Sequence, residues 1–92
     1  MVKYKLTRAN NFKRSFKKRK LNDDEETNYI EVVYKLLKGE ELEEKYKDHQ
    51  LKGNLKDFRE CHIKPDLLLM YRIVGDDLEL VDIGSHSYLF DK

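Results

Sequence analysis

The chain has 92 residues, of which 39% are hydrophobic and 40% charged, and its formal net charge at pH 7 is +1. This length allows one domain, residues 1–92, and the periodic runs of apolar residues indicate a folded chain rather than a disordered one. The single cysteine, Cys61, excludes an internal disulfide. No apolar run reaches the roughly 18 residues of a membrane span, so we expect a cytoplasmic protein.

The charge is distributed unevenly along the chain. Residues 1–20 contain nine of the 19 lysines and arginines and none of the 18 acids, so this segment carries +9 and the rest −8. An acid-free basic segment is typical of a polyanion-binding surface. The alternative is a solvated helix face, but the Glu–Lys pairs that commonly cover such a face cannot form there.

The first elements in chain order are a strand and a basic helix. Residues 2–6 alternate apolar and basic side chains, as a half-buried strand does. Thr7 can cap the helix that follows, and Leu21 is expected to close it. The apolar face of this helix recurs at spacings of three and four residues and consists of Ala9, Phe12 and Phe16.

A second helix is expected after Asn22, Asp23 or Asp24, any of which can cap it. Its predicted apolar stripe is Ile30, Val33, Tyr34 and Leu37, widened by Tyr29, Val32 and Leu36. Gly39 suits the left-handed position beyond the helix end. In the acidic connection that follows, Leu42 and Tyr46 are the expected anchors.

The second half of the chain is rich in strand patterns. Strands are predicted over residues 55–63, 67–74 and 78–83, with the aliphatic 67–74 in the centre of the sheet and a hairpin turn at 75–77. Residues 85–90 fit either a helical turn or an extended tail. The resulting order, β-α-α-β-β-β, predicts an α+β domain with two helices on one face of a small, largely antiparallel sheet, the other face being partly open.

All three histidines, His49, His62 and His86, fall in this strand-rich half. A histidine ordinarily changes its charge near neutral pH, so two of them placed across a phosphodiester can act as base and acid. RNA supplies the nucleophile, its 2′-hydroxyl, so no metal is required, and a nearby cation would stabilise the charge on phosphorus. The plainer interpretation of each histidine is a surface or satisfied core residue.

The alternation of side chains along a strand predicts which residues lie on the same face as His62. Within residues 55–63, His62 shares a face with Phe58 and Glu60, opposite Arg59, Cys61 and Ile63. Zinc is an alternative, but the histidine spacings of 13 and 24 residues match no short ligand motif. Cys61 as a nucleophile is a second alternative, against the default of a small buried residue.

Four segments together resemble a known family. They are YKDHQLKG at 46–53, FRECHIKPD at 58–66, LMYRI at 69–73 and GSHSYLF at 84–90. In this combination, and in its basic first helix, nearly all of the chain resembles the YafQ-like toxins of the RelE superfamily. The resemblance implies the RelE-like fold, a small twisted antiparallel sheet backed by two N-terminal helices. It also implies a type II toxin that acts as a ribosome-dependent mRNA endoribonuclease, and for the chemistry described above we expect no cofactor and no metal. Its implied partners are a cognate antitoxin protein, the 70S ribosome with its small-subunit rRNA, and mRNA.

The resemblance also implies roles for particular residues. The matching catalytic positions are His49, His62, Asp66 and His86. Among them His86 is the expected general acid and His49 the expected base, while His62 and Asp66 orient their partners, and the choice of base stays open. Glu60 stands where a relative has the shorter aspartate and is a candidate for catalytic support, and Phe90 matches an aromatic that positions the message.

Basic side chains complete the predicted RNA contacts. Candidate phosphate contacts are Lys52, Lys56 and Arg59, which also fit solvated strand positions. The expected ribosome-binding residues are Lys13, Arg14, Lys17, Lys18, Arg19 and Lys20. Two other functions remain open: a non-enzymatic ParE-like toxin of the same fold that inhibits a protein such as gyrase, and an RNA-binding module without chemistry.

Overall fold

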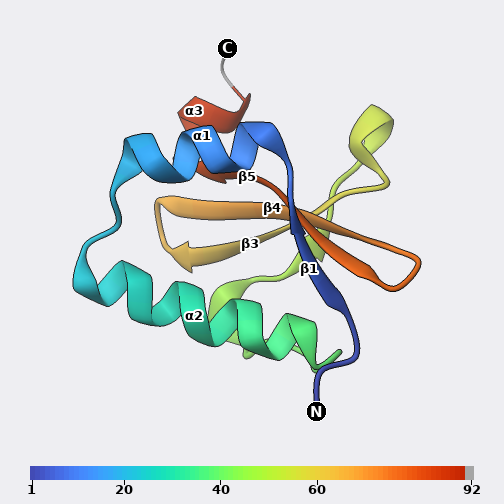
Figure 1. The fold of residues 1–92 in the computed structure, drawn as a ribbon. Coiled ribbons are helices and arrows are strands. Elements are labelled where there is room, and N and C mark those ends of the chain that lie inside the picture. Colours follow the sequence, from blue (N-terminus) through green and yellow to red (C-terminus); the bar gives the residue numbers. More distant parts are fainter. Residues whose placement is uncertain (91–92) are drawn as a thin grey trace.

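The structure, a computed structural model of the chain, describes residues 1–90 (Figure 1); the predicted domain, residues 1–92, extends two residues beyond this part. The helices are α1 (Asn10–Arg19), α2 (Asp23–Leu37) and α3 (His86–Phe90). The strands are β1 (Lys5–Arg8), β2 (His49–Gln50), β3 (Arg59–Lys64), β4 (Leu67–Val74) and β5 (Asp77–Gly84). Two short 3-10 turns, η1 (Glu44–Tyr46) and η2 (Gly53–Leu55), flank β2. The predicted element order is confirmed, with β2 and α3 added to it.

The five strands form one sheet in the order β1-β5-β4-β3-β2. The pairs among β2, β3, β4 and β5 are antiparallel, but β1 pairs with β5 in parallel. The sheet is therefore mixed rather than wholly antiparallel. Figure 1 shows α1 and α2 covering the same face of it, as predicted. The core lies between these two helices and the sheet, and it joins Phe12 of α1 and Val32 of α2 to the inward side chains of β3, β4 and β5.

The first strand begins three residues later in the sequence than its pattern predicted, at Lys5 instead of Val2, and it ends at Arg8. The N–H groups of Lys3 and Tyr4 both donate to Leu37 O, at 2.8 and 3.1 Å, so this segment is tied to the end of α2 instead of to the sheet. Thr7 is consequently part of β1 and does not cap α1, whose N-cap is Ala9. The C-cap is Lys20, in the left-handed region, so α1 ends at Arg19 and not at Leu21.

Helix α2 begins as predicted, but its buried face differs. Asn22 caps it through a reciprocal pair of hydrogen bonds with Glu25, of 2.8 and 3.0 Å. The buried residues are Val32, Val33 and Leu36, whereas Ile30 and Tyr34 of the predicted stripe are 58% and 51% exposed. Beyond the helix, Gly39 adopts φ +73° as expected, Leu42 is partly buried and Tyr46 is buried.

The strand-rich half is confirmed with one shortened strand. The predicted strand over residues 55–63 begins only at Arg59, because Leu55 closes the turn η2 and accepts from Phe58 N at 2.9 Å. Strand β4 is central and its residues 67–71 are buried, but Ile73 at its end is exposed. Residues 86–90 form a helix. None of the helices among residues 1–90 is long and apolar enough to cross a membrane.

Candidate active site

The face of the sheet turned away from α1 and α2 carries the histidine cluster. Alternation along β3 directs Cys61 and Ile63 into the core, so Glu60 and His62 project from the opposite face, as predicted. The register pairs His49 of β2 with Glu60, which places these two side chains on the same face. Phe58 lies just before β3 and so outside the strand it was expected to share with His62.

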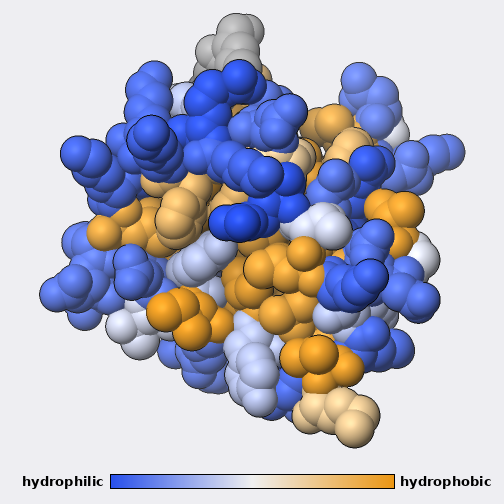
Figure 2. Space-filling view, viewed as in Figure 1, coloured by the Kyte–Doolittle hydropathy of each residue, from blue (hydrophilic) through white to orange (hydrophobic). Residues whose placement is uncertain are grey.

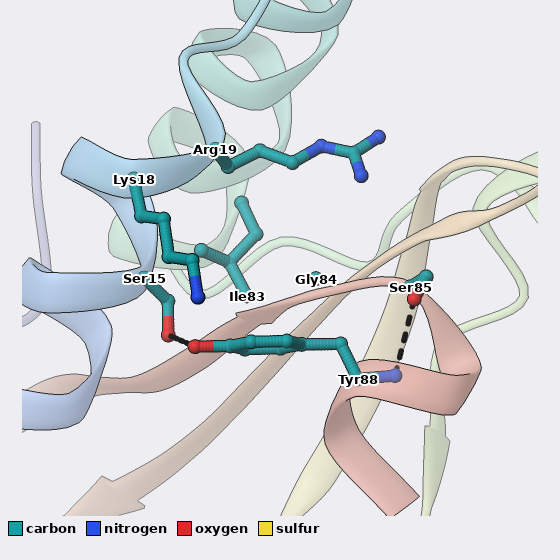
Figure 3. Close-up of a pocket in the computed structure, with 7 residues that line it drawn as sticks. All are labelled: Ser15, Lys18, Arg19, Ile83, Gly84, Ser85 and Tyr88. Atoms are coloured by element: carbon teal, nitrogen blue, oxygen red, sulfur yellow. Dashed lines mark hydrogen bonds between the residues drawn. The ribbon is translucent and has the colours of Figure 1, made fainter. Parts of the chain in front are cut away.

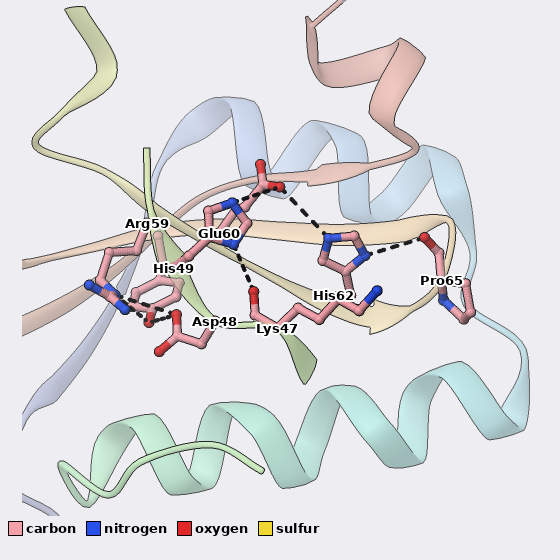
Figure 4. A network of polar contacts seen from close by, with 8 residues as sticks. Lys47, Asp48, His49, Arg59, Glu60, His62 and Pro65 are labelled. Atoms are coloured by element: carbon pink, nitrogen blue, oxygen red, sulfur yellow. Dashed lines mark hydrogen bonds and ion pairs between the residues drawn. The ribbon is translucent and has the colours of Figure 1, made fainter. Parts of the chain in front are cut away.

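Glu60 is the centre of this cluster (Figure 4). Its Oε1 lies 3.5 Å from His49 Nε2 and 3.8 Å from His62 Nε2. The carboxylate side chain is only 7% exposed, whereas the two rings are 51% and 25% exposed. Its second oxygen, Oε2, is buried and has no hydrogen-bond partner among the described residues. A buried carboxylate thus stands behind two histidines that reach solvent.

Backbone carbonyls fix how the two rings are turned. His49 Nδ1 lies 2.7 Å from Lys47 O, and His62 Nδ1 lies 3.3 Å from Pro65 O. Because a carbonyl oxygen can only accept, Nδ1 of each ring is the donor in these hydrogen bonds. The Nε2 atoms, both directed to Glu60, are therefore the nitrogens left to exchange protons with a substrate.

His86 and Asp66 are close to this cluster in the sheet topology, but no hydrogen bond or ion pair among the described residues joins them to it. In the strand register, His62 of β3 pairs with Leu68 of β4, and Leu68 pairs with Gly84 of β5. Gly84 is the last residue of β5, so this strand ends in the same row across the sheet as His62. His86 follows two residues later at the start of α3, where its ring lies 5.0 Å from that of Phe90. Asp66 is exposed in the turn between β3 and β4. Within residues 1–90, no hydrogen bond or ion pair joins either of them to Glu60.

A second polar network lies on the helix-covered face of β3. Asp48 Oδ1 accepts from Tyr71 Oη at 2.5 Å and from Arg59 Nε at 3.4 Å, and Tyr71 Oη also accepts from Arg59 Nε at 3.3 Å. Burial raises the pKa of Tyr71, and the bond to Asp48 raises it further. Burial alone lowers the pKa of Arg59, but its bonds to Tyr71 and Asp48 outweigh that effect and raise it.

This network ties β2, and with it His49, to the middle of the sheet. Sequence reasoning missed it, since Asp48 and Tyr71 showed no chemical signal apart from their places in the motif segments. Arg59, a candidate phosphate contact, is directed away from Glu60 and His62 and uses its Nε within the network.

The other predicted RNA contacts are at the surface. Lys52 and Lys56 are exposed on the loop between β2 and β3, and Phe90 is half-buried against His86. The basic side chains of α1 and of its C-cap are all exposed: Lys13, Arg14, Lys17, Lys18, Arg19 and Lys20. Figure 2 shows hydrophilic side chains gathered over α1 and hydrophobic ones in the region between α1 and α2.

Cys61 belongs to the core and not to the site. It is completely buried, and burial raises the pKa of its thiol, which opposes formation of a thiolate nucleophile. Among residues 1–90, no group of three or more His, Cys, Asp or Glu side chains is placed to hold a metal ion.

Comparison with known proteins gives consistent matches. The family described as "Bacterial toxin of type II toxin-antitoxin system, YafQ" matches residues 4–91. A putative toxin YafQ from Haemophilus influenzae is 40% identical over an alignment of 63 residues, and the match covers 64% of this chain and 62% of that protein. An mRNA interferase toxin YafQ from Escherichia coli K12 is 40% identical over 45 residues, or 49% of each chain. The matched part of the chain thus spans less than two thirds of the length of either relative.

Solved structures match over nearly the full length. A metal-bound toxin from Helicobacter pylori has a TM-score of 0.83 and 43% sequence identity, covering 98% of this chain and 100% of that one. The toxin of the E. coli DinJ-YafQ toxin-antitoxin complex has a TM-score of 0.81 at 24% identity, covering 97% and 99%. The second match shows a common fold only.

Proposed function

Because the chain belongs to the YafQ family of bacterial type II toxins, we propose that it is an endoribonuclease that cuts mRNA bound to the ribosome. Two similar E. coli proteins are named mRNA interferases. The observation that carries the proposal is the cluster of His49 and His62 against the buried Glu60, on the sheet face that α1 and α2 leave uncovered.

In the proposed reaction the message supplies its own nucleophile. His49 Nε2 takes the proton of the 2′-hydroxyl, the 2′-oxygen attacks phosphorus, and the P–O5′ bond breaks. His86 gives a proton to the departing 5′-oxygen. The products are a strand that ends in a 2′,3′-cyclic phosphate and a strand that begins with a 5′-hydroxyl. No oxidant, reductant or external nucleophile is consumed.

Glu60 stabilises the histidine that receives the proton. An imidazole that takes a proton becomes a cation, and the carboxylate of Glu60 lies 3.5 Å from the accepting nitrogen of His49. Since Glu60 is screened from water, its charge acts more strongly than that of an exposed acid would. His62 Nε2 lies 3.8 Å from the same oxygen, and Asp66 is the proposed partner of His62 when substrate is bound.

The partners follow from the surface and from the family. We propose that the exposed basic side chains of α1 bind rRNA of the small subunit, that Lys52 and Lys56 contact message phosphates, and that Phe90 stacks against a base. We propose that a cognate antitoxin covers part of this surface, and a relative from E. coli is known in a DinJ-YafQ toxin-antitoxin complex. The proposed place of action is the bacterial cytoplasm, where ribosomes translate.

Mapping of message 5′ ends after incubation with translating ribosomes tests this function. We expect cuts inside the message in the presence of ribosomes, and His86→Ala should slow single-turnover cleavage by about 10²–10⁴-fold with little change in ribosome binding. If the protein leaves the message intact and instead inhibits DNA supercoiling by gyrase, the ParE-like alternative is correct.

A further inference from the structure

A pocket of about 240 Å³ lies between the end of α1, the end of β5 and α3 (Figure 3). Ser15, Lys18 and Arg19 line it from α1, and Ser85 and Tyr88 from the other side. It adjoins the histidine site through α3, because Ser85 directly precedes His86. His86 and Tyr88 are two residues apart in a helix and so project to roughly opposite sides of it. The pocket and His86, the proposed general acid, therefore lie on opposite sides of α3.

The floor of this pocket is fixed in place. The hydroxyls of Tyr88 and Ser15 lie 2.8 Å apart in a hydrogen bond, and Tyr88 N donates to Ser85 Oγ at 3.1 Å. The ring lies directly on β5, since a Cβ on Gly84 would be 2.5 Å from Tyr88 Cδ2. Glycine at this position is what allows the aromatic ring to close the bottom of the pocket.

The open side of the pocket is cationic. Lys18 Nζ lies 5.8 Å from the centre of the Tyr88 ring, and Figure 3 shows it directed over that ring. Arg19 reaches out above the same pocket, with one guanidinium nitrogen held 3.3 Å from Glu25 Oε2. None of the described lining residues is acidic, and Lys18 has no ion-pair partner within residues 1–90.

We propose that this pocket binds a backbone phosphate of the message close to the phosphate that is cut, an inference that rests on the proposed endoribonuclease function. An ammonium group, a guanidinium group and serine hydroxyls form a donor set suited to a phosphate diester. The histidine cluster itself contains a buried carboxylate and no lysine or arginine, so the substrate's charge must be bound beside it. This proposal reassigns Lys18 and Arg19 from rRNA to the message, and it leaves Lys13, Arg14, Lys17 and Lys20 as proposed rRNA contacts.

With an RNA that cannot be cleaved, binding at the pocket can be measured separately from catalysis. We would titrate the labelled protein with a short single-stranded RNA whose 2′-hydroxyls are all 2′-O-methyl groups, and follow amide resonances by NMR. We expect the amides of Gly84, Ser85 and Tyr88 to shift. Lys18→Ala should weaken binding about tenfold. It should also lower the slope of log K against log salt by about 0.7, the value for one phosphate contact on a single strand.

Lys5→Ala is the matched control, because Lys5 is an exposed lysine on β1 that does not line the pocket, so this variant should bind the oligonucleotide as tightly as wild type. Equal affinities for the oligonucleotide in wild type and Lys18→Ala would overturn the proposal. A Lys18→Ala defect seen only in ribosome binding would assign the pocket to rRNA and would also overturn it. So would shifts that inorganic phosphate produces and the oligonucleotide does not. If the oligonucleotide binds here but native message is never cut, the proposed function fails and the phosphate site stands.

Discussion

Replacement of Glu60 by glutamine should make the protein more stable and less active. Glutamine keeps the shape of the side chain but removes its charge. In the wild-type protein the Glu60 carboxylate is 93% shielded from solvent, and one of its oxygens has no hydrogen-bond partner in the described chain. An unsatisfied buried polar group costs about 1–3 kcal/mol, and more when it is charged. For a domain of this size each kcal/mol shifts the melting temperature by about 4–8 °C.

We therefore expect Glu60→Gln to raise the melting temperature by at least about 4 °C. Single-turnover cleavage should fall by about 10²-fold, since the cation formed on His49 loses its counter-charge. Calorimetry and message cleavage on ribosomes measure the two effects.

The matched control is Asp82→Asn. Asp82 also has a buried carboxylate. In the strand register Asp82 of β5 pairs with Met70 of β4, and Met70 pairs with Glu60 of β3, so Asp82 and Glu60 lie in the same row across the sheet. Its Oδ1 accepts from Ile83 N at 2.9 Å, so its removal should not stabilise the fold. A Glu60→Gln protein that melts below wild type, or that cuts message within about threefold of the wild-type rate, would refute the reasoning.

Three further predictions concern the scaffold. Tyr71→Phe removes the hydroxyl that binds Asp48 and Arg59, so the free energy of unfolding in urea should fall by about 1–2 kcal/mol, whereas an unchanged urea midpoint would mean that this network does not hold β2. Burial raises the pKa of the Cys61 thiol, so above roughly pH 8.5 the unfolded chain loses a proton that the folded chain keeps. Stability should then fall with rising pH by up to about 1.4 kcal/mol per pH unit. Urea melts between about pH 8 and 10 measure this slope, and an equal slope in Cys61→Ala would assign it to other groups. Asn22→Ala should cost about 1 kcal/mol through loss of the α2 cap, and a loss below about 0.3 kcal/mol would contradict the role of that cap.

The sequence predicted the order of the elements better than the faces they bury. Helix α2 is a clear example, because apolar residues occupy most of positions 29–37 and several stripes fit the helical period equally well. Packing into the common core buries Val32, Val33 and Leu36 and leaves Ile30 and Tyr34 exposed. Likewise, the parallel pairing of β1 with β5 joins residues more than 70 positions apart, and no local pattern contains it.

The site was predicted in part for similar physical reasons. Alternation alone placed Glu60 and His62 together on one face of β3, and the structure confirms it. The contact between His49 and Glu60 depends on β2, a strand of two residues that is too short to show a period. Burial of Glu60 was also beyond local reasoning, because a glutamate in an amphipathic strand is ordinarily taken as solvated.

Cleavage of a message with one altered nucleotide tests the central claim most directly. Replacing the 2′-hydroxyl at the mapped cut site by hydrogen removes the proposed nucleophile and leaves codon, base and phosphate in place. We predict that wild-type protein on programmed ribosomes stops cutting at that position, while the unmodified message yields a 2′,3′-cyclic or 3′-phosphate end. Cleavage of the deoxy message at the wild-type rate would mean that water or a metal hydroxide attacks phosphorus, and it would contradict acid–base catalysis by His49 and His86.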